Sequence, residues 1–169
     1  AHAVIRSFVQ DDISDDDLRL IINKTYKNFD HENIAPLVNI EKNKYILELF
    51  YGPTFAFKDY ALQFLGHLFS HVLQISNRKI TVLGATSGDT GSAAIDAFKG
   101  KDDIQVFILH PYNKISEVQR RQMTTVVEKN IHNIALKGTF DDCQKIVKQL
   151  FVDNELQSKT SLTAVNSIN

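Results

Sequence analysis

One stretch, Ile80 to Phe98, restricts the fold of this chain more than any other. It reads ITVLGATSGDTGSAAIDAF, an apolar run rich in β-branched residues, then a loop of Gly, Ser, Thr and Asp, then apolar residues at helical spacing. This pattern predicts a strand, a tight turn and a helix. Because the first N–H groups of a helix lack partners and lie at the positive end of its dipole, the turn suits an anion.

The glycine loop does not have the spacing of two better-known phosphate-binding loops. It lacks the Gly-Lys-Ser/Thr ending of a nucleotide P-loop, and its glycines follow G-x-x-x-G-x-x-G rather than G-x-G-x-x-G. Asp89 also argues against a simple phosphate cradle, since a carboxylate repels phosphate. From the loop alone, a capped strand-to-helix turn with no ligand stays an alternative.

Strands and helices alternate from Ile80 onward. Strands are predicted at 80–85, 104–109, 131–136 and 161–165, and helices after the glycine loop, over 116–129 and from 139 to about 151. Two of these helices begin with capping signals, Ser116 with Gln119 and Thr139 with Asp142. The fold class is therefore α/β, a parallel sheet with helices on both faces, which binds ligands at the carboxyl ends of its strands.

The region before this alternation begins with a helical lead-in, in which Ser14 and Asp17 form a capping signal. An extended segment at 45–50 and a turn at 51–54 follow. The most apolar helix is predicted from Phe55 to about Ile75, with Lys58 among the aromatic residues of its first turn. Lysines are seldom placed in apolar surroundings, and both the helix dipole and this shell favour a neutral, nucleophilic amine. The plainer alternative is a lysine that extends past its neighbours into water.

Composition and residue spacing argue against several classes of partner and site. Nineteen basic and twenty acidic residues give a formal charge of −1, so nothing points to nucleic acid as a partner. The single cysteine, Cys143, is expected in the core, and its isolation agrees with a reducing, cytoplasmic compartment. No apolar run has membrane-spanning length. His67 and His71 have zinc-ligand spacing but no evident third ligand, and no G-x-S-x-G elbow occurs.

Four motifs in order resemble the threonine synthase family of fold type II enzymes, which use pyridoxal 5'-phosphate (PLP). They are Phe57-Lys58-Asp59, the run from Ala85 to Gly91, Lys114-Ile115-Ser116, and Asn166-Ser167-Ile168-Asn169. The resemblance implies conversion of O-phospho-L-homoserine and water to L-threonine and phosphate. It also implies three parts: a lead-in over 1–45, the strand and Schiff-base-lysine helix of the large PLP domain over 46–79, and a doubly wound βαβαβαβ lobe over 80–169.

The resemblance assigns roles residue by residue. Lys58 would be the Schiff-base lysine and Asp89 would meet the phenolic oxygen of the cofactor, where many relatives carry Asn. The substrate carboxylate would lie against the four residues Thr86, Ser87, Gly88 and Thr90. Asn166 and Ser167 would contact the substrate phosphate.

Family members are much longer, so we expect an internal piece that is truncated after the Asn-Ser-x-Asn motif and is inactive alone. The cofactor-phosphate loop and an arginine that follows this motif in the family do not appear in the chain. Two alternatives stay open. One is another fold type II enzyme, of the cysteine synthase or threonine dehydratase type, and the other is a non-catalytic module that binds a small anion.

Overall fold

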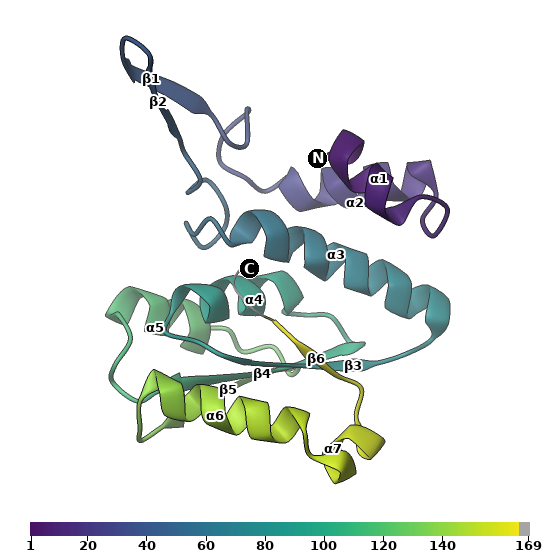
Figure 1. The fold of residues 1–169 in the computed structure, drawn as a ribbon, viewed down its shortest axis with the longest axis vertical. Coiled ribbons are helices and arrows are strands. Elements are labelled where there is room, and N and C mark those ends of the chain that lie inside the picture. The colour runs from purple at the N-terminus through teal and green to yellow at the C-terminus, as the bar shows by residue number, and fades with distance from the viewer. Residues whose placement is uncertain (166–169) are drawn as a thin grey trace.

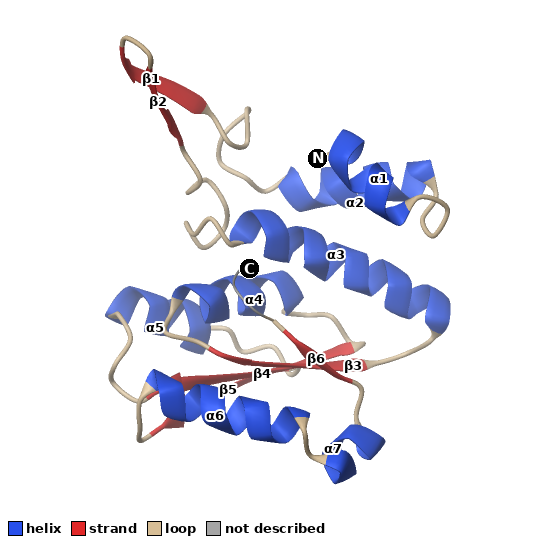
Figure 2. Ribbon diagram, in the orientation of Figure 1, coloured by secondary structure: helices blue, strands red, loops and turns tan. Residues whose placement is uncertain are grey.

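The computed structural model describes residues 1–165, and Figures 1 and 2 show its elements. In chain order these are α1 (His2–Val9), α2 (Asp15–Tyr26), β1 (Leu37–Glu41), β2 (Lys44–Leu47), α3 (Asp59–Ser76), β3 (Ile80–Ala85), α4 (Asp89–Phe98), β4 (Ile104–Pro111), α5 (Glu117–Thr124), β5 (Ile131–Leu136), α6 (Phe140–Phe151), α7 (Asn154–Lys159) and β6 (Leu162–Ala164).

The centre of the fold is a four-stranded sheet in the order β5-β4-β3-β6. All three strand pairs are parallel, which confirms the predicted α/β class with its parallel sheet. The chain steps from β3 to β4 to β5 in one direction and then returns to place β6 on the other side of β3. This reversal lies between β3 and β6, and such a switch point is where open parallel sheets bind ligands.

Helices cover both faces of this sheet, as predicted (Figure 1). Successive strand residues point to opposite faces, so Val82 and Val106 join one core with α3, α4 and Met123 of α5, whereas Leu83 and Leu109 join a second core. In the second core they pack against Cys143 of α6, and burial raises the pKa of that thiol. Cys143 is thus a core residue, as expected from the sequence.

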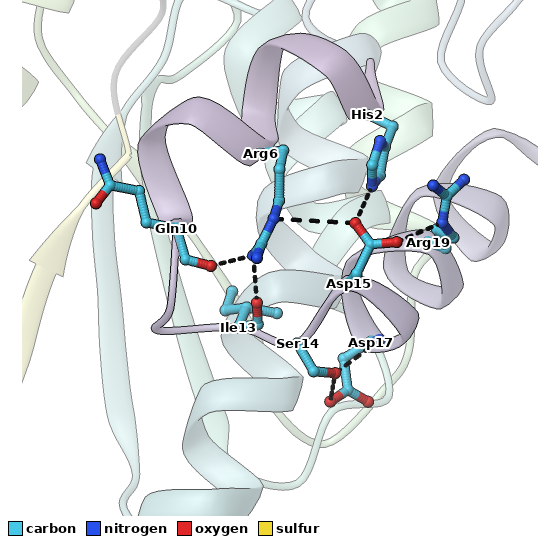
Figure 3. A network of polar contacts seen from close by, with 8 residues as sticks. All are labelled: His2, Arg6, Gln10, Ile13, Ser14, Asp15, Asp17 and Arg19. Atoms are coloured by element: carbon cyan, nitrogen blue, oxygen red, sulfur yellow. Dashed lines mark hydrogen bonds and ion pairs between the residues drawn. The ribbon is translucent and has the colours of Figure 1, made fainter.

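The lead-in consists of α1 and α2, joined by a polar network around Asp15 (Figure 3). The Asp15 carboxylate accepts hydrogen bonds from Arg19 Nε at 2.6 Å and His2 Nε2 at 2.7 Å, and these two contacts lower the pKa of Asp15. The predicted cap is present, because Ser14 Oγ accepts from the Asp17 N–H at 3.1 Å. The segment just after α2 packs on the start of α3, where Phe29 lies edge-to-face with Tyr60.

Strands β1 and β2 form an antiparallel hairpin that extends away from the sheet and helices (Figure 2). Every residue of both strands is exposed. The sequence predicts an extended segment at 45–50, and the structure ends the strand at Leu47. The division into 1–45, 46–79 and 80–169 stays a prediction.

Two predicted helices are shorter than expected. Helix α3 begins at Asp59 rather than Phe55, because Phe55 has a φ of 61° and cannot continue a right-handed helix. Helix α5 ends at Thr124 rather than Lys129, where the β-branched residues Thr125, Val126 and Val127 follow. The short helix α7 was not predicted, since it has little apolar periodicity.

Candidate active site

The loop between β3 and α4 lies at the carboxyl edge of the sheet, next to the switch point. Residues 80–98 form the predicted strand, turn and helix, and α4 begins at Asp89. Gly88 has a φ of 146° and a ψ of −75°, a conformation available only to glycine. The shape of the loop thus depends on this residue.

Thr86 holds the loop together from inside. The residue is only 2% exposed, and its Oγ1 accepts hydrogen bonds from the N–H groups of Gly88 at 2.9 Å and Gly91 at 2.8 Å. Its own N–H donates to the carbonyl of Leu109 on β4 at 2.9 Å. The hydroxyl oxygen that the family resemblance would place against a substrate carboxylate is therefore engaged by the loop itself.

The remaining loop residues are more accessible. Ser87 is exposed, and Thr90 is half-buried in the first turn of α4. Within residues 1–165, the N–H groups of Ser87, Asp89 and Thr90 donate to no other residue. Three backbone donors near the positive end of the α4 dipole can therefore meet an anion.

Lys58 and Asp89 come together although 31 residues separate them in the sequence. Lys58 occupies the N-cap position of α3, its side chain is only 11% exposed, and its Nζ lies 3.3 Å from Asp89 Oδ2. The same Nζ lies 4.3 Å from the ring centre of Phe57. The aromatic neighbour predicted from the sequence is present, and the structure adds a carboxylate facing the amine.

Asp59 fixes the backbone next to Lys58. It is fully buried, and its carboxylate accepts hydrogen bonds from the Thr54 N–H at 2.8 Å and the Thr54 hydroxyl at 2.7 Å. Burial raises the pKa of Asp59, while these hydrogen bonds act against that shift. The turn at 52–58 is thereby tied to the start of α3.

A cavity of about 490 Å³ adjoins this pair. Its lining includes the aromatic side chains of Phe50, Phe55 and Phe57, and polar groups from the α4 and α5 helices. Lys58 follows Phe57 and contacts Asp89, so its amine lies beside two residues of the lining. A volume of this size suits a small organic ligand.

Two glutamines of α5 belong to this site, and the sequence reasoning missed their role. Gln119 Nε2 donates to Asp89 Oδ1, and Gln122 Nε2 donates to the Thr54 carbonyl at 3.1 Å. In the sequence Gln119 is explained by the capping signal of α5. The usable signal was the Gln-x-x-Gln spacing, which places both side chains on one helix face.

Some predictions cannot be placed. Asn166 and Ser167 lie outside the described residues. Residues 1–165 contain no group of three His, Cys, Asp or Glu side chains arranged to hold a metal, and none of their helices is long and apolar enough to cross a membrane.

Comparison with known proteins now identifies close relatives. A scan of protein-family models gives no match. The chain is 53% identical over its whole length to threonine synthase from Pseudomonas aeruginosa, and it covers 36% of that protein. It is 50% identical to the Saccharomyces cerevisiae threonine synthase and covers 35% of it. The chain thus spans about a third of the length of these relatives.

Solved structures of threonine synthases also align with nearly the whole chain. The PLP-bound threonine synthase from Brucella melitensis has a TM-score of 0.93 at 45% identity, and 99% of this chain aligns with 36% of that one. Yeast threonine synthase has a TM-score of 0.90 at 48% identity, covering 99% of this chain and 35% of that one. O-ureido-L-serine synthase, at 13% identity and a TM-score of 0.56, shares the fold alone.

Proposed function

We propose that this chain carries the cofactor-binding lysine of a threonine synthase. Its whole length aligns with a segment that makes up about a third of each of these relatives. The reaction would be the PLP-dependent conversion of O-phospho-L-homoserine and water to L-threonine and phosphate. The observation that carries the proposal is the contact of Lys58 Nζ with Asp89, 3.3 Å apart beside the cavity.

The residues at this site fit PLP. A largely buried amine is available for covalent attachment to an aldehyde, aromatic side chains can pack against a planar ring, and a carboxylate lies next to the amine. When bound, PLP supplies an electron sink that stabilises negative charge on carbon. Lys58 would hold the cofactor and, once displaced by the substrate amine, take protons from the substrate carbons and return them through Nζ.

Asp89 would face the phenolic oxygen of the cofactor and the nitrogen that joins it to Lys58. A carboxylate in this position favours protonation of that nitrogen, since the negative charge stabilises the positively charged form. This role also resolves the mismatch between Asp89 and a phosphate cradle. Asp89 is half-exposed, with 48% of its side chain accessible, so it can meet a ligand in the cavity.

The substrate carboxylate would bind at the start of α4, at Thr86, Ser87, Gly88 and Thr90. Support comes from the N–H groups of Ser87, Asp89 and Thr90, which have no partner within residues 1–165. Thr86 would contribute mainly by shaping the loop, because its oxygen already accepts from Gly88 and Gly91. Asn166 and Ser167 remain the proposed contacts of the substrate phosphate, and the cytoplasm remains the proposed compartment.

A chimaeric enzyme tests this proposal. In it, the 169-residue chain replaces the matching segment of the Pseudomonas aeruginosa threonine synthase. We expect the chimaera with PLP to show the visible absorbance of the lysine-bound cofactor and to release phosphate from O-phospho-L-homoserine. Lys58→Ala should abolish both, whereas Lys24→Ala, on the exposed side of α2, should alter neither.

The outcomes separate the alternatives. Cofactor absorbance without phosphate release, but with turnover of an O-acetylated or unphosphorylated hydroxy amino acid, would favour another fold type II enzyme. Absorbance that persists in Lys58→Ala would refute the assignment of the lysine. The chain alone is expected to release no phosphate, because its relatives are about three times as long.

A further inference from the structure

We propose that Gln119 is a positioning residue that holds the Asp89 carboxylate in place against Lys58. The inference rests on the proposed function, because its consequence is for the cofactor that Lys58 would carry. From the sequence alone, Gln119 is accounted for by its part in the capping signal at the start of α5, and no role in the site is expected.

The Asp89 carboxylate is held from two sides. Lys58 Nζ contacts Oδ2 at 3.3 Å, and Gln119 Nε2 donates a hydrogen bond to Oδ1. These partners come from the start of α3 and the first turn of α5. A side chain that is 48% exposed would otherwise be free to turn toward water, so a second contact decides its direction.

The orientation of the Gln119 amide is set by Ser116. The Ser116 hydroxyl donates to Gln119 Oε1 at 2.9 Å, while Ser116 Oγ accepts from the Gln119 N–H at 3.3 Å. With Oε1 occupied as an acceptor, the NH₂ group is the end of the amide that points to Asp89. A carboxylate needs such a donor.

Comparison with helix α6 shows that this glutamine is diverted from its usual capping role. In α6 the capping box is complete, since Thr139 accepts from Asp142 N–H and the Asp142 side chain accepts from Thr139 N–H. In α5 the Ser116 N–H donates to no side chain within residues 1–165. The side chain of Gln119 instead reaches the loop after β3.

The loop is shaped to admit this side chain. A Cβ on residue 88 would collide with Oε1 and Cδ of Gln119, so only glycine allows the approach. Helix α5 is anchored one turn beyond this contact, by Met123 in the core and by the hydrogen bond from Gln122 to the Thr54 carbonyl. The position of Gln119 relative to Asp89 is therefore fixed by packing.

The test is the pH titration of cofactor absorbance in the chimaera. A negative charge beside the nitrogen that joins Lys58 to PLP favours its protonated form, so Asp89→Ala should lower the titration midpoint by about one pH unit or more. Gln119→Ala should lower it in the same direction, by roughly 0.5 to 1 pH unit, because an unheld carboxylate turns toward water. Gln119→Met, which keeps the side-chain length without a donor, should do the same.

Two controls test whether the effect of Gln119 depends on its contact with Asp89. Thr124→Ala removes a side-chain hydrogen bond of the same helix, from the exposed Thr124 hydroxyl to the Arg120 carbonyl at 2.9 Å, and it should leave the midpoint unchanged because that bond involves neither Asp89 nor the cavity. In an Asp89→Ala background, adding Gln119→Ala should cause no further shift, since Gln119 acts through Asp89.

The possible negative results distinguish the inference about Gln119 from the proposed function. If Gln119→Ala and Gln119→Met keep the wild-type midpoint while Asp89→Ala moves it, Gln119 does not position Asp89. A shift of equal size in the presence and absence of Asp89 would also overturn the inference. If Asp89→Ala itself leaves the midpoint unchanged, or no cofactor absorbance forms, the proposed function fails instead.

Discussion

Thr86 stabilises the conformation of the loop between β3 and α4 through its side-chain hydroxyl. Its hydroxyl oxygen accepts two backbone hydrogen bonds in a place that is 2% exposed to solvent. Both donors, Gly88 and Gly91, are themselves buried. The loop that offers its N–H groups to an anion is therefore preorganised from within.

This arrangement predicts a stability effect of Thr86→Ala. The substitution leaves two buried N–H groups without an acceptor and should lower the free energy of unfolding by about 1–3 kcal/mol. Thr86→Ser, which keeps Oγ, should cost clearly less. Equilibrium unfolding in urea measures both variants, and equal losses for Ala and Ser would show that the hydroxyl does not hold the loop.

At the level of elements, α5 links the two halves of the candidate site. It brings Gln119 to Asp89 and Gln122 to Thr54, while its own N-terminus is stabilised by charge. Glu117, in its first turn, accepts hydrogen bonds from Arg120 and Arg121 at 2.8 Å, and these hold the pKa of Glu117 at about 2. A carboxylate at this position also faces the positive end of the helix dipole.

Glu117→Gln should therefore reduce stability in a pH-dependent way. Because the folded-state pKa is depressed, the ionised carboxylate stabilises the fold above the ordinary pKa of 4.5, and this contribution is lost as pH falls toward about 2. The unfolding free energies of wild type and Glu117→Gln should differ at pH 7 and converge near pH 2. Added salt at pH 7 should shrink the difference, since the site is exposed. A difference that is constant with pH would contradict the ion-pair assignment.

On the scale of the whole molecule, the hairpin and the sheet are supported very differently. The central strands β3 and β4 are paired on both sides and covered by helices. The β1–β2 hairpin exposes apolar side chains such as Leu37, Ile40 and Ile46 and is paired only with itself within residues 1–165. An isolated two-stranded hairpin is marginally stable in water.

Hydrogen exchange of the 169-residue chain should resolve this difference. We expect amides of residues 37–47 to exchange through local opening, far faster than those of β3 and β4, which should approach the global stability. Mass spectrometry of peptides from both regions provides the measurement, with α3 peptides as an internal reference. Protection of the hairpin equal to that of β3 would mean that it is supported by contacts that the present structure does not contain.

Local signals were sufficient for much of the fold. The strand, turn and helix of 80–98, the caps of Ser14, Ser116 and Thr139, and the parallel sheet all follow from periodicity, capping chemistry and the alternation of strand and helix. Boundaries failed where a single backbone angle decided them, as at Phe55 before α3. Lys58 and Asp89 were each identified as candidates, but nothing local linked them.

What the sequence alone determined was therefore most of the elements, α7 being an exception, and the types of group that they present, because these depend on neighbours a few residues away. Only the tertiary structure decided which groups meet. Asp89 lies 31 residues from Lys58 and 30 from Gln119. The three converge because α3 leads into β3, while α4 and α5 connect parallel strands, so that all three helices begin at one edge of the sheet. Strand order and helix packing fix that convergence, and neither can be read from spacing along the chain.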